Sequence, residues 1–144
     1  MIRLEQMLGR RSVPYQETTR AIRVTVEPFY LEDQSEPDQN HYVWAYKVNI
    51  TNEGDQTVKL LNRHWRITDS NGRLQEVLGA GVVGEQPTLK PGGTFEYTSG
   101  TPLATPSGIM VGSYEMETAG TGERFSVRIP AFSLDSPHEP RRIN

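Results

Sequence analysis

The sequence has 144 residues, a formal net charge of −3 and no cysteine. A chain of this length fits one domain that buries roughly two-thirds of its unfolded surface, so it needs no disulfide or metal to stabilise it. The lack of cysteine excludes thiolate catalysis, iron–sulfur clusters and zinc–thiolate sites. The acidic balance disfavours general binding to nucleic acid, because it gives no broad positive field for phosphates.

The two ends of the sequence look unlike its middle. Residues 1–17 contain arginines but no long apolar run, so they predict neither a secretory signal nor a membrane span. We expect them to form a flexible extension, with a docking arm as the alternative, and we expect a soluble, cytoplasmic protein. Residues 18–134 should form one domain, and residues 135–144, which include Pro137 and Pro140, should form an irregular tail.

Alternation of apolar and polar residues predicts strands along residues 18–134. The first covers 21–30, and after an acidic, polar connection at 31–40 a second covers 41–50. Later strands are expected at 94–100, 108–118 and 123–132. The residues expected to face the core are Ile22, Val24, Val26, Tyr42, Trp44, Tyr46, Val48, Ile50, Phe95, Tyr97, Met110, Gly112, Tyr114, Met116, Phe125, Val127 and Ile129. Pro130 should mark an edge or a bulge.

The stretch from Leu60 to Gly84 joins two more strands and a glycine-rich loop. Val58 and Leu60 share one phase of the alternation, whereas Trp65 and Ile67 share the other. A bulge at Leu60–Leu61, or a switch of the strand from one sheet to the other there, would reconcile the two phases. The segment DSNG at 69–72 then supplies the residues that a tight reversal needs, and LQEVL follows as a strand.

These patterns favour one fold class. About seven or eight short strands, frequent turn signals and no helical period are typical of an antiparallel β-sandwich, so we expect an all-β protein. The cysteine and tryptophan spacing of antibody domains is missing. A fibronectin type III-like member of the immunoglobulin-like sandwiches is therefore expected.

The glycine-rich loop matches the G-x-G-x-x-G pattern through Gly79, Gly81 and Gly84. In a dinucleotide site this pattern must open a helix, whose N-terminus holds the pyrophosphate. Here the prolines at 87 and 91 and the missing helical period argue against such a helix. The glycines are expected to turn the chain between sheets, with a backbone-amide nest for a small anion as the alternative.

Arg63 shares the face of Leu61, Trp65 and Ile67. A buried guanidinium is costly without a partner, so it should either extend to solvent or meet a carboxylate, with Glu85, Glu96 and Asp69 as candidates. A structural ion pair is the simpler interpretation. The alternative makes Arg63 and the glycine loop an anchor for an anion or a peptide carboxylate.

Other chemistry has no local signature. The histidines at 41, 64 and 138 lack the spacing with which neighbouring residues share a metal, and the carboxylates at 32, 33, 36 and 38 lack the pattern of a calcium loop. No G-x-S-x-G elbow, P-loop or S-x-x-K motif occurs. We therefore expect no catalytic residues, no metal site and no cofactor.

Five segments of the sequence resemble the ApaG family, also called CorD. They are TTRAIRVTVEPFYLEDQS, YVWAYKVNITNEG, VKLLNRHWRITDSNG, EVLGAGVVGEQPTLKPGGTFEYTSGTPLATPSGIMVGSYEM and FSVRIPAFSL, and they cover nearly all of residues 18–134. They include the pair Arg63-x-Trp65, the run Gly84-Glu85-Gln86-Pro87 and the motif Tyr97-x-Ser99-Gly100.

The resemblance implies a fibronectin type III-like β-sandwich. Similar domains in eukaryotic F-box proteins and in a DNA polymerase delta-interacting protein imply a protein-binding module, whereas bacterial members are linked by name to cobalt resistance and magnesium efflux. We therefore expect a non-enzymatic protein–protein interaction module, which presents its loops or an unpaired sheet edge to the partner and is indirectly linked to divalent cation homeostasis. A sensor that binds pyrophosphate or a nucleotide at Gly79, Gly81, Gly84 and Arg63 is the alternative. The partner is expected to be another protein, with neither nucleic acid nor membrane involved, and a homodimer is left open.

Overall fold

The structure is a computed structural model that describes residues 14–138. Within this range the strands are β1 (Tyr15–Thr19), β2 (Ile22–Tyr30), β3 (Tyr42–Asn52), β4 (Val58–Asp69), β5 (Leu74–Ala80), β6 (Thr88–Leu89), β7 (Thr94–Leu103), β8 (Ser107–Thr118) and β9 (Arg124–Asp135). Two single 3-10 turns, η1 (Glu32–Gln34) and η2 (Pro37–Gln39), lie in the acidic connection. No helix in this range is long and apolar enough to cross a membrane.

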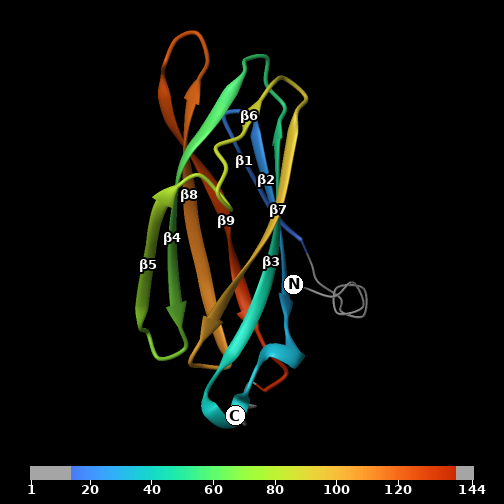
Figure 1. Cartoon of the computed structure of the whole chain (residues 1–144), viewed down its shortest axis with the longest axis vertical. Coiled ribbons are helices and arrows are strands. Elements are labelled where there is room, and N and C mark those ends of the chain that lie inside the picture. Colours follow the sequence, from blue (N-terminus) through green and yellow to red (C-terminus); the bar gives the residue numbers. More distant parts are fainter. Residues whose placement is uncertain (1–13, 139–144) are drawn as a thin grey trace.

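The strands form two sheets that pack face to face (Figure 1). The four-stranded sheet has the order β1-β2-β3-β7, and the five-stranded sheet has the order β5-β4-β8-β9 with β6 also paired to β4. Every strand pair is antiparallel. The predicted antiparallel β-sandwich is therefore confirmed.

The core lies between the sheets and consists of the alternating side chains that the sequence indicates. The largest fully buried side chain is that of Trp44, and Tyr114 and Phe132 follow it. Trp65 meets Tyr46 and Phe132 edge-on, with ring centroids 5.4 and 5.9 Å away. Burial of aromatic side chains supplies much of the stabilisation of such a core, because each removes a large apolar area from water. Of the residues expected to face inward, Phe95, Gly112 and Phe125 are only partly buried.

Both predicted irregularities are confirmed. The pairing of β4 with β8 shifts between Leu60 and Asn62, so the two apolar phases of β4 meet at a bulge. The pairing of β8 with β9 shifts between Met110 and Gly112, whose partners are Phe132 and Ile129. Pro130 lies within that second shift, where the ladder does not need the N–H that proline lacks.

The N-terminal boundary at residue 17 is wrong, because the ordered domain starts earlier. Residues 15–19 form β1, which pairs with β2, and the ring of Tyr15 lies 6.0 Å from that of Phe132. The segment YQETT has only one large apolar residue, so its own pattern does not show a strand, and pairing supplies its stability. The rest of the predicted extension, residues 1–13, lies outside the described residues. So do residues 139–144 of the predicted tail, whose first residue, Asp135, is the last residue of β9.

The two sides of the sandwich differ. On one side β9 packs against β1 and β2 of the other sheet, and the Arg128 N–H donates to Thr19 Oγ1 at 3.2 Å. On the opposite side lie the edge strands β5 and β7. Figure 1 shows β5 at the outside of the molecule, next to β4. The stretch that the sequence singles out, Leu60 to Gly84, lies on this side.

Candidate binding surface at the β5 edge

The glycine-rich loop is a reversal at the end of β5, and it starts no helix. Val82 and Glu85 face each other, and the N–H of each donates to the carbonyl of the other at 2.8 and 2.9 Å. Between them Val83 has φ 44° and Gly84 has φ 82°, the two successive left-handed residues of a tight turn. The prediction that these glycines turn the chain is therefore confirmed, but the expectation that they turn it between sheets is wrong, because β5 and β6 both pair with β4 in the five-stranded sheet.

Position 81 requires a glycine because of its backbone conformation and its close neighbours. It has φ 64°, and a Cβ at this position would lie 2.2 Å from the Glu85 carbonyl oxygen. Its N–H donates to the Leu61 carbonyl at 2.8 Å. The N–H groups of Gly81, Val82 and Glu85 thus all make hydrogen bonds within the protein. An anion at this loop would have to compete with those bonds.

The β4 bulge is the place where the loop attaches. The Leu61 carbonyl at the bulge accepts a second hydrogen bond from Gln86 Nε2 at 2.9 Å, and the Leu60 N–H donates to the Pro87 carbonyl at 3.0 Å. The side chain of Val82 is fully buried. The bulge and the glycine loop, separate features in the sequence, are therefore one structural unit.

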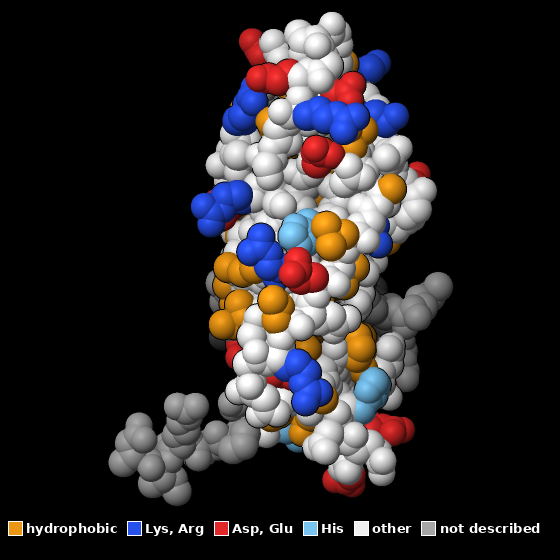
Figure 2. All heavy atoms as spheres, turned by 90° about the vertical axis from the view of Figure 1, so that its left-hand side faces the viewer, with side chains coloured by type: hydrophobic (Ala, Val, Ile, Leu, Met, Phe, Trp, Pro, Cys, Tyr) orange, Lys and Arg blue, Asp and Glu red, His pale blue; other side chains and the backbone are white. Residues whose placement is uncertain are grey.

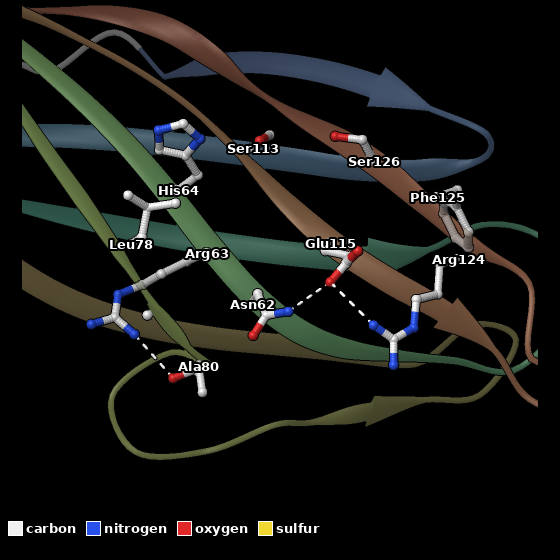
Figure 3. A pocket seen from close by; sticks show the side chains of 11 residues that line it. Asn62, Arg63, His64, Leu78, Ala80, Ser113, Glu115, Arg124, Phe125 and Ser126 are labelled. Carbon is white, nitrogen blue, oxygen red and sulfur yellow. Dashed lines mark hydrogen bonds and ion pairs between the residues drawn. The ribbon is translucent and has the colours of Figure 1, made fainter.

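Arg63 does not form the structural ion pair that the sequence suggested. Its Nη1 donates to the carbonyls of Ala80 and Gly81 at 3.0 and 2.9 Å, and no carboxylate of residues 14–138 lies within ion-pair distance of it. The guanidinium reaches these carbonyls because its neighbour across the ladder is Gly79, at which a Cβ would lie 2.8 Å from Nη1. Figure 3 shows one terminal nitrogen directed at Ala80 and the other directed away.

Behind Arg63 the core contains three tyrosines that the sequence did not mark as a group. The hydroxyls of Tyr97 and Tyr114 are 2.5 Å apart and buried. Burial raises the pKa of each of these two hydroxyls, and that of Tyr46, above the ordinary value, while the positive charge of Arg63 acts in the opposite direction. These hydroxyls therefore stay protonated at neutral pH and serve as hydrogen-bonding groups of the core.

A groove of about 740 Å³ crosses the outer face of the five-stranded sheet next to β5. Leu78 of β5 and Phe125 of β9 line its two sides, and small polar side chains such as Ser113 lie between them (Figure 3). Asn62 Nδ2 donates to Glu115 Oε1 at 2.6 Å within it. Beside the groove, His64 Nε2 lies 2.7 Å from Glu76 Oε2. This mixture of apolar walls and polar floor suits contact with another surface.

The large apolar side chains that are most exposed in the described residues lie on the same side of the molecule. They are Leu78, 69% exposed, Val83, 55%, Leu74, 54%, and Ile109, 53%. Leu74 and Leu78 lie on the outer face of β5, and Thr68 is paired both with Leu74 and with Ile109, which places those two in one row across the sheet. Figure 2 shows hydrophobic side chains gathered over this side, among basic, acidic and histidine side chains.

The outer edge of β5 carries backbone groups that face away from β4. At one end of the β4–β5 ladder the Asp69 N–H donates to the Arg73 carbonyl, and at the other end the Gly81 N–H donates to the Leu61 carbonyl. The residues of β5 that form hydrogen bonds with β4 are therefore the odd-numbered ones. Because an antiparallel ladder alternates, the N–H and C=O of Leu74, Glu76 and Leu78 point outward. Within residues 14–138 no strand pairs with β5 on that side.

The structure thus joins some of the predicted site residues and separates others. Arg63, Gly79 and Gly81 are in contact, whereas Gly84 lies at the tip of the turn, where a Cβ would meet no other part of the described chain. No group of three or more histidine, aspartate or glutamate side chains in residues 14–138 could hold a metal ion. The exposed leucines of β5 were missed, although Leu-x-Glu-x-Leu at 74–78 puts both leucines in phase with a glutamate, a signal of an outward-facing pair.

Comparison with known proteins agrees with the resemblance found in the sequence. A family model described as "ApaG domain" matches residues 32–118. The chain is 67% identical over 130 residues to Protein ApaG of Paramagnetospirillum magneticum, covering 90% of this chain and 99% of the relative. It is 62% identical over 130 residues, with the same coverage, to Protein ApaG of Agrobacterium fabrum. The structure is similar to the crystal structure of the "Putative ApaA Protein" from Bordetella pertussis, with a TM-score of 0.77. The two sequences are 48% identical, and the match covers 88% of this chain and 98% of that one.

Proposed function

Because the chain belongs to the ApaG-domain family, we propose that it is a non-enzymatic protein-binding module whose partner docks on the β5 edge and the adjoining outer face of the five-stranded sheet. The observation that carries this proposal is the position of the exposed apolar side chains. Leu74, Leu78, Val83 and Ile109 are the most exposed large hydrophobics of the described residues, and all lie on or beside this face. Single exposed leucines are ordinary, but a group on one face marks an interaction site.

The lack of protection along β5 supports the same surface. Proteins commonly protect an edge strand with lysine, proline or a bulge, because an open edge attracts other strands. The sequence of β5, LQEVLGA, has neither lysine nor proline, and its pairing with β4 is regular. By contrast, the edge strand β7 contains Pro102 and β9 contains Pro130.

Differential capture tests the proposal. The full chain serves as bait in lysate, together with Leu78→Lys, which places a charge at the centre of the surface, and Gln16→Lys, which makes the same change at an exposed position on the edge strand β1. We expect one or more proteins that the wild type and Gln16→Lys enrich equally and that Leu78→Lys loses about tenfold, a loss equivalent to ~1.4 kcal/mol. Partners that bind all three baits equally would contradict the proposed surface.

An anion sensor is the second candidate, favoured by the position of Arg63 beside the glycine loop without a carboxylate partner in residues 14–138. It would use Arg63, Gly79, Gly81 and Gly84. Titration calorimetry with pyrophosphate and with adenine nucleotides tests it: binding that Arg63→Met removes would support it, and absence of heat at millimolar ligand would eliminate it. The indirect link to cobalt and magnesium homeostasis and the cytoplasmic location belong to the proposal as expectations from the family resemblance and the sequence.

A further inference from the structure

We infer that the partner binds as an added strand: an extended segment of another protein pairs with the outer edge of β5, sets apolar side chains beside Leu74 and Leu78, and presents a carboxylate to Arg63. This inference rests on the proposed function and makes it more specific. It specifies the backbone groups of β5 that bind the partner, the alternation of side chains along the partner's segment, and the charge of that segment.

The backbone of β5 already has the geometry that strand addition needs. The N–H and C=O groups of Leu74, Glu76 and Leu78 point away from β4, and the strand is regular from residue 74 to residue 80. Main-chain hydrogen bonds to such an edge supply affinity, and side chains at alternate positions supply specificity. The segment would end near Ala80, because the Ala80 carbonyl already accepts a hydrogen bond from Arg63.

The outer face of β5 favours apolar side chains on the added segment. Leu74 and Leu78 are more than half exposed, and Glu76 between them has its carboxylate 2.7 Å from His64 Nε2. In a sheet, side chains directly across from each other contact, so two apolar residues of the added segment would cover the two leucines. A small polar residue between them would face Glu76.

On the core-facing side of the β5 edge, Arg63 favours an acidic side chain of the added segment. Arg63 points inward from β4, passes Gly79 and reaches the far edge of β5, where the bonds from Nη1 to two carbonyls hold it in place. Its second terminal nitrogen is directed away from the loop in Figure 3. A carboxylate is the preferred partner for a guanidinium held in this way, because charge-assisted bonds are the strong ones. The acidic residue would lie in the opposite phase to the apolar ones.

The neighbouring charges favour the same partner. Arg66 and Arg73 also have no carboxylate within ion-pair distance in residues 14–138, whereas the acidic groups beside them are engaged. Glu76 bonds to His64, and Asp69 Oδ1 accepts the N–H groups of Asn71 and Arg73. The cations near this edge are therefore available, and an acidic segment complements them.

The experiment begins with a displayed library of random nine-residue segments, selected on the full chain and counter-selected on Leu78→Lys. The probes are the enriched segments made as synthetic peptides. We expect two apolar residues in alternate positions and an acidic residue in the opposite phase. In hydrogen exchange measured by NMR, the amides of Leu74, Glu76 and Leu78 should be slowed at least tenfold by saturating peptide, whereas those of Gln75, Val77 and Gly79, which already face β4, should change little.

Substitutions separate the parts of the inference. Arg63→Gln should weaken an acidic peptide about tenfold and leave its glutamine analogue unchanged, while Arg128→Gln, which removes an exposed charge on β9, should leave both unchanged. Protection of another strand, or failure to enrich any segment, would overturn strand addition, while the capture experiment would still decide whether the module binds proteins. Slowing of the same amides in concentrated protein without peptide would assign the edge to a second copy of the chain and overturn the acidic segment.

Discussion

At the scale of single residues, Arg63 and Gly79 show how one small residue directs a large one. The guanidinium fits beside Gly79 because glycine has no Cβ, and a Cβ at this position would lie 2.8 Å from Nη1. The alternation of β4 places Arg63 correctly on the inner face, but the partner of a long side chain depends on the strand across the ladder. The sequence favours a carboxylate partner for Arg63, whereas the structure supplies two backbone carbonyls.

The buried tyrosines give a residue-scale prediction in alkaline solution. Burial raises the pKa of Tyr97 and Tyr114 in the folded protein above their unfolded value of about 10. Below about pH 10 both states keep their protons and the tyrosines contribute their full stability, but above it only the unfolded state loses them. The free energy of unfolding should therefore fall as the pH rises above about 10, by up to about 1.4 kcal/mol per pH unit for each hydroxyl.

Urea unfolding at several pH values between neutrality and pH 11 checks this, with the double variant Tyr97→Phe and Tyr114→Phe as the comparison. The double variant keeps both rings and removes both partners of the hydrogen bond, so it avoids leaving one hydroxyl unpaired. Its free energy of unfolding should fall less steeply above about pH 10. An equal slope in both proteins would show that these hydroxyls do not remain protonated in the folded state.

At the scale of elements, the bulge of β4 and the glycine loop behave as one unit. The sequence predicts the bulge from the clash of two apolar phases and predicts the turn from its glycines. It does not predict that Gly81, Gln86 and Pro87 all attach to the bulge, since those bonds join segments about 25 residues apart. Local patterns report periodicity and turn chemistry, while such contacts depend on the tertiary arrangement.

Two glycines of the loop provide a matched pair for testing this unit. Gly81 and Gly84 both have positive φ, but a Cβ at Gly81 would lie 2.2 Å from the Glu85 carbonyl, whereas, apart from its chain neighbours, no atom of residues 14–138 would lie within 4 Å of one at Gly84. Gly84→Ala should cost about 1 kcal/mol of stability from backbone strain alone. Gly81→Ala should cost clearly more, at least about 2 kcal/mol, because the turn must also open.

Chemical denaturation of both variants under one set of conditions gives the comparison. If Gly84→Ala were the more damaging change, the tight packing of Gly81 on Glu85 would not be what shapes the loop. The same measurement bears on the G-x-G-x-x-G match, because the pattern is explained here by a turn and by one close approach between backbones. A dinucleotide site would instead need the helix that this loop does not start.

At the scale of the whole molecule, the sequence was sufficient for the fold class and for most of the core. Strict alternation in β3 identifies Tyr42, Trp44, Tyr46, Val48 and Ile50, all of them buried. It was insufficient for β1, whose five residues YQETT gain stability by pairing with β2 and contacting β9. It also did not show which strand would carry the proposed binding surface, because whether a strand is an edge depends on strand order and on no feature of the strand itself.

Strand order leaves the two sides of the sandwich unequal. On one side β9 packs against β1 and β2. On the other side β5 pairs, among the described strands, with β4 alone, and it carries two exposed leucines. A domain that only needed to be stable would gain from covering or charging this edge. We therefore expect a partner protein to cover this side.

Photo-crosslinking in the living cell tests that expectation most directly. A photoreactive phenylalanine analogue replaces Leu78 in one strain and Gln16 in another, both exposed positions on edge strands. We expect the position-78 protein to form a discrete covalent adduct with another protein on irradiation and the position-16 protein to form none. Adducts of equal yield at both positions, or none at position 78 when the protein is folded and expressed, would contradict it.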